Sequence, residues 1–229
     1  PTACASLGAS AGSRDDMLQD DDRTAVAPAT FAGGALDRYR HVCAFVNGQA
    51  VDERVLDAFV RQGVDQGDHL LYLVDPARAA APVNRLRHLG FDAAALLEEH
   101  RCEVRTWTDT YLRGGRFDQA AMLDLLDRML VSRPSPRTRM IADMGWAIGR
   151  DDDAEHLIEF EARANFIHGR HEHIVICSYD PAQFDGTFIL DILRTHPLVY
   201  LGGMLQENPF FVAPSQFLAE RAGLAAGSP

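Results

Sequence analysis

The sequence contains no lysine, so arginine supplies all of the basic side chains apart from histidine. Schiff-base chemistry needs a lysine amine, and the phosphate-binding loop of P-loop nucleotidases needs a lysine that reaches the phosphates. Both kinds of site are therefore excluded. The sequence also lacks the GxGxxG motif of dinucleotide-binding proteins, the HExxH motif of zinc proteases and the serine elbow of Ser-His-Asp hydrolases.

Long apolar runs are absent too: none approaches the length of a membrane helix, and no basic segment followed by an apolar one marks a signal peptide. The four cysteines are scattered without a CxxC pair, which is typical of reduced thiols in a cytoplasmic protein. The net charge of −11 argues against nucleic acid or an anionic membrane as a direct partner. We therefore expect a cytoplasmic protein that binds neither nucleic acid nor a membrane directly.

Short apolar stretches alternate with amphipathic helical patterns along most of the chain. The expected strands are residues 41–46, 69–74, 102–107, 139–144, 174–177 and 198–201. This alternation predicts a three-layer α/β/α fold with a mainly parallel sheet covered by helices on both faces. Residues 1–38 and 219–229 are expected to be tails, which leaves residues 39–218 as one domain.

The first expected strand enters its helix through residues 47–53, where a P-loop protein carries its phosphate-binding loop. This segment has one glycine, no lysine and two acids, Asp52 and Glu53, which would repel a phosphate. Asp143, at the end of another strand, resembles the acid that helps to hold Mg²⁺ in such enzymes, although a strand-end acid more often caps or pairs locally. Nucleotide hydrolysis is therefore disfavoured.

Polar side chains gather at the expected carboxyl ends of several strands, where open α/β sheets bind their ligands. Cys177, Tyr179 and Asp180 lie at one such end, and Asn47 and Asp143 lie at two others. The aromatic candidates for an apolar pocket lining, with ordinary packing as the alternative, are Trp146, Tyr179, Phe210 and Phe211.

Histidine and cysteine supply a second candidate site, for a soft or borderline metal. His41 and Cys43 are two residues apart on one strand and so face the same side, Cys177 lies on another strand, and His196 precedes a proline. Together these four residues have the chemistry to ligate such a metal. The favoured alternative is that both thiols are buried and inert and that His196 hydrogen-bonds in a turn.

Glu161 is the one candidate expected on a helix. It points toward the same pocket, lies on the solvated face, or pairs with Arg163. The residue pattern leaves these three alternatives open.

In their order and spacing, the motifs of residues 39–215 resemble those of the MEDS family of sensory domains, named after methanogens, methylotrophs and DcmR. The matching elements are His41-x-Cys43, Gly63 with Gly67-Asp68, Tyr111 with Gly115 and Phe117-Asp118, Met144-x-Trp146, Glu161, Cys177-x-Tyr179-Asp180, His196-Pro197 and Asn208-Pro209-Phe210. Asp143 stands where the family usually has glutamate, and Ser178 where it often has glutamine. Both differences shorten a polar side chain.

The resemblance implies a RecA/KaiC-like core with a degenerate P-loop that senses small hydrocarbon derivatives. We expect neither catalysis nor a cofactor. It also implies output partners such as a histidine kinase or an anti-sigma-type regulator. The family positions that it carries over are His41, Cys43, Glu161, Cys177, Tyr179, Asp180 and His196. A RecA-like strand order would place strand 41–46 between strands 139–144 and 174–177, with Cys43 and Cys177 as neighbours.

We therefore expect a non-catalytic small-molecule sensor, and a homodimer is compatible with this expectation. The alternatives are a degenerate nucleotide-binding protein and an interaction module for an anti-sigma-type kinase. The expected ligand-binding residues are His41, Cys43, Asn47, Asp143, Trp146, Glu161, Cys177, Tyr179, Asp180 and His196.

Overall fold

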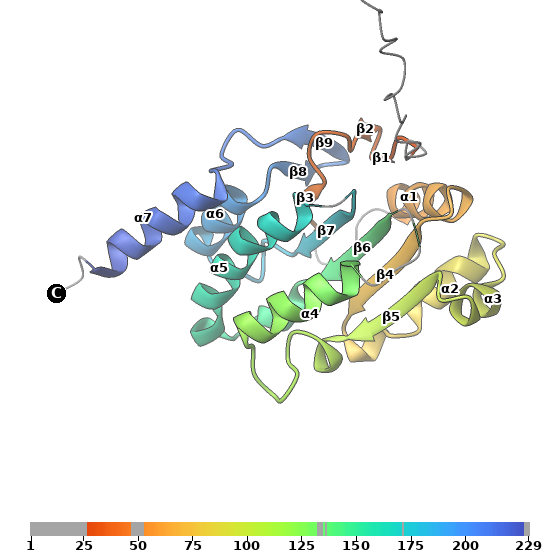
Figure 1. Ribbon diagram of the computed structural model, residues 1–229, viewed down its shortest axis with the longest axis horizontal. Helices are drawn as coiled ribbons and strands as arrows, with labels where there is room; N and C mark the ends of the chain where they lie inside the picture. The colour runs from red at the N-terminus through yellow and green to blue at the C-terminus, as the bar shows by residue number, and fades with distance from the viewer. Residues whose placement is uncertain (1–26, 47–52, 132–134, 136, 171, 227–229) are drawn as a thin grey trace, which may run out of the picture.

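The computed structural model of this chain describes residues 27–46, 53–131, 135, 137–170 and 172–226 (Figure 1). Its centre is a seven-stranded sheet with the order β5-β4-β6-β7-β3-β8-β9. The strands are β3 (His41–Phe45), β4 (His69–Val74), β5 (Cys102–Thr106), β6 (Thr138–Asp143), β7 (Ile174–Tyr179), β8 (Leu198–Leu201) and β9 (Met204–Glu207). The strand pairs are parallel except the β8–β9 hairpin, whose turn places Gly202 and Gly203 at positive φ.

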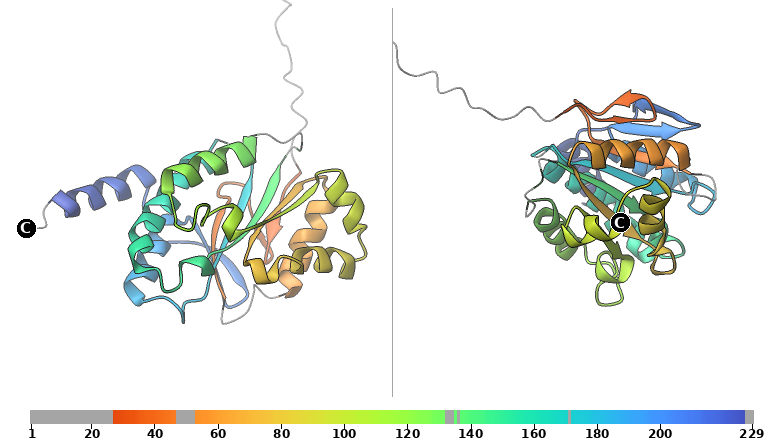
Figure 2. Two further views of the ribbon diagram at one scale, coloured as in Figure 1. Left: turned by 90° about the horizontal axis from the view of Figure 1, so that it is seen from below. Right: turned by 90° about the vertical axis from the view of Figure 1, so that its right-hand side faces the viewer.

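Helices cover both faces of the sheet (Figure 2). One face is covered by α1 (Glu53–Asp65), α2 (Ala81–His88) and α3 (Ala93–Glu98), and the other by α4 (Gln119–Val131), α5 (Asp151–His168) and α6 (Gly186–Thr195). The short helices η1 (Pro76–Arg78), η2 (Trp107–Asp109) and η3 (Gly145–Ala147) follow β4, β5 and β6 directly. The predicted three-layer fold with a mainly parallel sheet is confirmed. Among the helices described, none is both long enough and apolar enough to cross a membrane.

The two apolar cores follow from the alternation of side chains along each strand. On β7, Val175, Cys177 and Tyr179 face the core under α4, α5 and α6, whereas Ile174 and Ile176 face the core under α1, α2 and α3. A central parallel strand is buried on both faces, so it needs a continuous apolar run rather than an alternating one.

The strand order differs from the expectation in one respect. β3 lies between β7 and β8, and β7 separates it from β6, so strand 41–46 does not lie between the other two. The expected proximity of the two cysteines is confirmed, because Cys43 and Cys177 are directly paired in the β3–β7 register. Apolar patterns identify strands, but they do not specify which buried strand pairs with which.

The folded part of the chain extends beyond the predicted boundaries at both ends. A hairpin of β1 (Thr30–Phe31) and β2 (Gly34–Ala35) precedes Tyr39, and the Phe31 side chain is 1% exposed against Phe59 and Tyr200. At the other end, α7 (Pro214–Ala226) continues through the predicted tail, and its Phe217 is buried in the α5–α6 core. The rest of the predicted N-terminal tail, residues 1–26, lies outside the described residues.

A buried ionic cluster joins α1 to β6 at the amino ends of the strands. The Asp68 carboxylate accepts hydrogen bonds from Arg137 (3.0 and 2.8 Å) and from Arg139 (2.6 Å), and all three side chains are at most 3% exposed. Arg139 fits because Gly63 has no side chain: a Cβ there would lie 2.8 Å from Arg139 Cδ. The cluster lies at the opposite end of the strands from their carboxyl termini.

Candidate functional site

The structure separates the predicted site residues into two groups on opposite faces of the sheet. His41, Glu161, Cys177, Tyr179 and His196 meet in the core under α5 and α6. Asp143 and Asp180 instead line a cavity at the carboxyl ends of the strands, on the face of α1 and α2. The predicted site residues that the structure describes therefore do not form one site. The reason is the two-residue period of a strand, which sends Cys177 and Ser178 to opposite faces.

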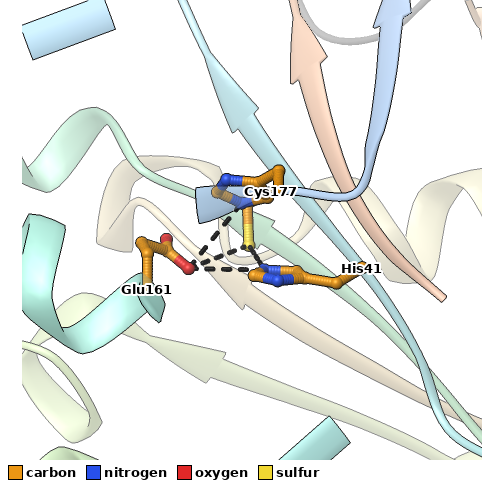
Figure 3. A group of neighbouring side chains, drawn as sticks. His41, Glu161 and Cys177 are labelled. Atoms are coloured by element: carbon orange, nitrogen blue, oxygen red, sulfur yellow. Dashed lines mark hydrogen bonds and ion pairs between the residues drawn. The ribbon is translucent and has the colours of Figure 1, made fainter. Parts of the chain in front are cut away.

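The first group consists of four potential metal ligands from four parts of the chain: His41 on β3, Glu161 on α5, Cys177 on β7, and His196 at the end of α6. We call it the His–Glu–Cys–His cluster. Glu161 Oε2 lies 3.3 Å from His41 Nε2, 3.7 Å from His196 Nε2 and 4.0 Å from Cys177 Sγ. Figure 3 shows three of these side chains converging on one point. Each of the four residues is at most 3% exposed.

Hydrogen bonds around the cluster fix the orientation of its histidines. Asn165 donates its amide NH₂ to the carbonyls of Glu161 and Thr195, which leaves its Oδ1 to accept from His41 Nδ1 at 3.1 Å. His196 Nδ1 lies 2.9 Å from the carbonyl of Ile192, which can only accept. Both rings therefore carry a proton on Nδ1 and turn Nε2 toward the centre of the cluster.

The electrostatics of the cluster favour the charged form of Glu161 and the neutral forms of His196 and of the two thiols. Burial raises the pKa of Glu161, but the His41 hydrogen bond and the nearby His196 outweigh it, so the pKa is lowered overall. Burial lowers the pKa of His196 to about 3. Burial and the Glu161 carboxylate raise the pKa of the Cys177 thiol well above its usual value, and the same causes act on Cys43. Without a cation beside them, these protonated thiols are poor nucleophiles.

The second group lies around a cavity of about 500 Å³, within the size range of small-molecule sites. Its walls come from α1, β4, η1, α2, η2, β6, η3 and β7, and from residues that follow β3, η3 and β7. Its polar or aromatic lining residues include Tyr72, Arg78, Trp107, Asp143, Ser178 and Asp180. The remaining lining is mostly apolar, for example Leu56, Pro82 and Ile141.

Tyr72 contributes a buried polar group to the cavity wall. The Tyr72 hydroxyl is buried and makes no hydrogen bond to the residues that the structure describes. The two acids are satisfied locally, because Asp143 accepts from the amide of Gly145 (2.9 Å) and Asp180 from that of Ala182 (3.0 Å). Burial raises the pKa of Asp143. The expectation that Asp143 caps locally, rather than standing ready for a metal, agrees with this geometry.

Of the remaining predicted residues, the structure describes Trp146 and Cys43, and both lie outside the two groups. Trp146 is in the core, stacked on Tyr111 with ring centroids 5.1 Å apart, and lines neither group. Cys43 is fully buried beside the cluster, but Glu161 takes the place that the predicted metal set gave to Cys43. Asn47 lies outside the described residues, as does most of the predicted degenerate P-loop. Of the alternatives for Glu161, pairing with Arg163 is wrong, since that arginine pairs with Glu159 (3.7 Å).

The residue pattern did not single out Tyr72, Arg78, Trp107 or Asn165. A signal for Asn165 exists in retrospect: it follows Glu161 by four residues on the same helix and so shares its inward face. Tyr72 carries no comparable signal, because a tyrosine within an apolar strand usually packs in the core.

Comparison with known proteins gives three findings. A family model described as the methanogen/methylotroph, DcmR sensory domain (MEDS) matches residues 40–197. The transcriptional repressor DcmR of Methylorubrum extorquens is 24% identical over 191 residues, which cover 82% of this chain and 67% of that protein. The fold was also compared with the crystal structure of the flagellar accessory protein FlaH from Methanocaldococcus jannaschii, with a TM-score of 0.45 and 11% sequence identity. The match covers 76% of this chain and 81% of that one, and the similarity is too low to carry an argument. Because the family model spans well over half of its length, this chain belongs to the MEDS family of sensory domains.

Proposed function

We propose that this chain is a non-catalytic sensory domain that binds a small, largely apolar organic molecule, such as a hydrocarbon derivative, and acts in signal transduction or transcription regulation. Membership of a family of sensory domains supports the sensory role. The relative named as a transcriptional repressor supports the regulatory setting. The proposed binding site is the cavity at the carboxyl ends of β4, β6 and β7.

The observation that carries this proposal is the Tyr72 hydroxyl, which is buried in the cavity wall without a hydrogen-bond partner among the described residues. An unpaired buried hydroxyl is costly, so a ligand that hydrogen-bonds to it recovers that free energy. Arg78 and Ser178 lie in the same wall. An apolar body with one or two polar atoms is the chemistry that this lining selects.

The charges around the cavity disfavour binding of a nucleoside triphosphate. Among the described residues, three acids line the cavity, Asp75, Asp143 and Asp180, and two cations, Arg78 and Arg85. Arg85 is already paired with Asp57. The chain also has no lysine to reach a phosphate. A small uncharged or weakly polar molecule is therefore the better match.

Binding in this cavity would contact both the sheet and the η1–α2 segment, which supplies Arg78, Ala81 and Pro82. A ligand that binds one arrangement of these elements more tightly shifts the population toward it. A partner that recognises that arrangement, such as a histidine kinase or an anti-sigma-type regulator, would read the signal.

The test is a binding screen with short-chain alcohols, ketones and halogenated alkanes. Trp107 lines the cavity, so its fluorescence should change when a probe binds, and ligand-observed NMR supplies an independent measurement. Ala81 is exposed at the start of α2 and borders the cavity, so Ala81→Trp should fill the entrance without disturbing the core. Saturable binding that this variant abolishes supports the proposal. Turnover of a bound probe, or Mg²⁺-dependent binding of ATP in place of the organic probes, would contradict it.

A further inference from the structure

We propose that the His–Glu–Cys–His cluster is a binding site for one divalent transition-metal ion, with zinc as the expected occupant and His41, Glu161, Cys177 and His196 as its ligands. The cluster lies on the other side of the sheet from the cavity, so this inference does not depend on what the cavity binds.

Four of the six distances between the ligand atoms are close to those of a tetrahedral site. Zinc binds histidine nitrogen at about 2.0–2.1 Å, carboxylate oxygen at a similar length and cysteine sulfur at about 2.3 Å. Tetrahedral angles then separate two nitrogen or oxygen ligands by about 3.4 Å, and a sulfur from either by about 3.6 Å. The corresponding separations here are 3.3 Å and 3.7 Å from Glu161 Oε2 to the two histidines, 3.5 Å from Cys177 Sγ to His41 Nε2, and 4.0 Å from that sulfur to Glu161 Oε2. All four atoms lie within 4.8 Å of one another. The two remaining pairs both involve His196 Nε2, and closing a separation of up to 4.8 Å to a tetrahedral one requires a shift of about 1 Å.

The surrounding hydrogen bonds are those that a metal site requires. Ligating histidines usually donate their second ring N–H to a carbonyl or carboxylate, which fixes the ring and its tautomer. His41 donates to the side-chain oxygen of Asn165, and His196 donates to the carbonyl of Ile192. The Tyr179 hydroxyl donates to Glu161 Oε1 at 2.6 Å, which leaves Oε2 for the centre of the cluster. Lone pairs of three side chains therefore converge on one point.

A proton does not satisfy this arrangement as well as a metal does. A proton on His41 Nε2 would neutralise Glu161, but His196 Nε2 would still lack a hydrogen-bond partner among the described residues. Unpaired nitrogen in a site with no exposed surface is costly. A divalent ion serves all four ligands at once, because it binds the two imidazoles and balances the Glu161 carboxylate and the Cys177 thiolate to zero net charge. Binding releases the thiol proton of Cys177 to solvent.

The ligand chemistry favours a borderline ion over a hard one. Two imidazoles and a thiolate suit zinc, cobalt or copper, whereas magnesium and calcium prefer oxygen ligands. Four protein ligands from four separate parts of the chain close the site, as in structural zinc centres. Such a metal would tie β3, β7, α5 and the end of α6 together.

The experiment uses the purified chain, unfolded in chelator and refolded with Zn²⁺ or Co²⁺, with metal content measured by mass spectrometry. We expect about one metal ion per chain, and visible cobalt bands with a thiolate-to-cobalt charge-transfer band. Cys177→Ser should abolish that band and reduce bound metal at least tenfold. Asn165→Ala, which affects a positioning residue, should weaken metal affinity about 10- to 100-fold while leaving the thiolate band intact at saturation.

Two matched cysteine variants make the result specific. Cys102→Ser changes a thiol that is equally buried but lies under the opposite helical layer, and Cys43→Ser changes the neighbour of Cys177. Both should retain the metal and the charge-transfer band. If Cys177→Ser does not refold, His196→Asn provides the loss-of-metal measurement. Substoichiometric metal in the refolded wild-type chain would overturn the proposal, and so would a thiolate band that survives in Cys177→Ser but disappears in Cys43→Ser.

Discussion

Replacing Tyr72 by phenylalanine should make the ligand-free protein more stable and its ligand binding weaker. The Tyr72 side chain is 3% exposed, and its hydroxyl has no hydrogen-bond partner among the described residues. A buried polar group without a partner costs about 1–3 kcal/mol. Because this hydroxyl borders a cavity that can admit water, the lower end applies, and the variant should gain about 1 kcal/mol in unfolding free energy.

The same change should weaken binding, because a probe that uses the hydroxyl loses a hydrogen bond worth about 1 kcal/mol, or roughly a fivefold increase in Kd. Urea unfolding measures the first effect, and titration of Trp107 fluorescence measures the second. The matched control is Tyr179→Phe, which removes an equally buried hydroxyl that donates to the Glu161 carboxylate at 2.6 Å. That variant should lose about 2 kcal/mol of stability, since hydrogen bonds to charged groups are worth about 1.5–3 kcal/mol.

Tyr72→Phe should therefore raise the free energy of unfolding, and Tyr179→Phe should lower it, although both remove one hydroxyl group. If Tyr72→Phe destabilised the protein as much as Tyr179→Phe, the Tyr72 hydroxyl would already have a hydrogen-bond partner in the ligand-free protein. It would then not be available to a ligand. If Tyr72→Phe left the affinity of every probe unchanged, the hydroxyl would play no part in recognition.

Three further predictions concern stability. Asp68→Ala should lower the free energy of unfolding, measured in urea, by about 3–5 kcal/mol, because it leaves two buried guanidinium groups without their carboxylate. The control is the exposed ion pair of Arg128 and Asp124, whose removal should cost less than about 0.5 kcal/mol. Phe31→Ala should cost about 3 kcal/mol, because the hairpin belongs to the core, and an unchanged melting temperature would show that it does not. Asp143→Asn should be more stable than wild type at neutral pH, with a difference that shrinks as the pH falls toward 4. The sign follows because burial raises the pKa of Asp143 in the folded state, so that folding favours the protonated carboxyl. The stability that this protonated form contributes is lost as the pH rises through the folded pKa, whereas asparagine stays neutral. A stability difference that stayed constant with pH would contradict this cause.

The sequence predicted the layers of the fold because its buried strands carry continuous apolar runs. It also predicted that Cys43 and Cys177 would be neighbours, and the β3–β7 register pairs them directly. The boundaries were harder to predict, because the hairpin before Tyr39 is only two residues per strand and its one large anchor, Phe31, gives no periodicity. A single aromatic residue in a polar segment is indistinguishable from a tail until its pocket is known.

The sequence identified many of the candidate site residues, but it did not predict how they are arranged in space. His41, Glu161, Cys177 and His196 are far apart in the sequence, and only the packing of α5 against β3 and β7 brings Glu161 into the cluster. Predicting the cavity depended on long-range geometry even more. The hydroxyl that lacks a partner among the described residues belongs to Tyr72, on a strand that the motifs did not mark. Strand alternation could have warned that Cys177 and Asp180 need not serve one site, but the assignment to a face requires the register.

The proposed sensory function depends most directly on the cavity. The measurement that tests it is ligand-observed NMR of the organic probes with the wild-type chain and with Ala81→Trp, side by side. The account predicts that at least one probe binds the wild type saturably at one site, and that the tryptophan side chain in the entrance abolishes this binding without lowering the melting temperature. Equal binding to both proteins, or no saturable binding of any probe to the wild type, would contradict it.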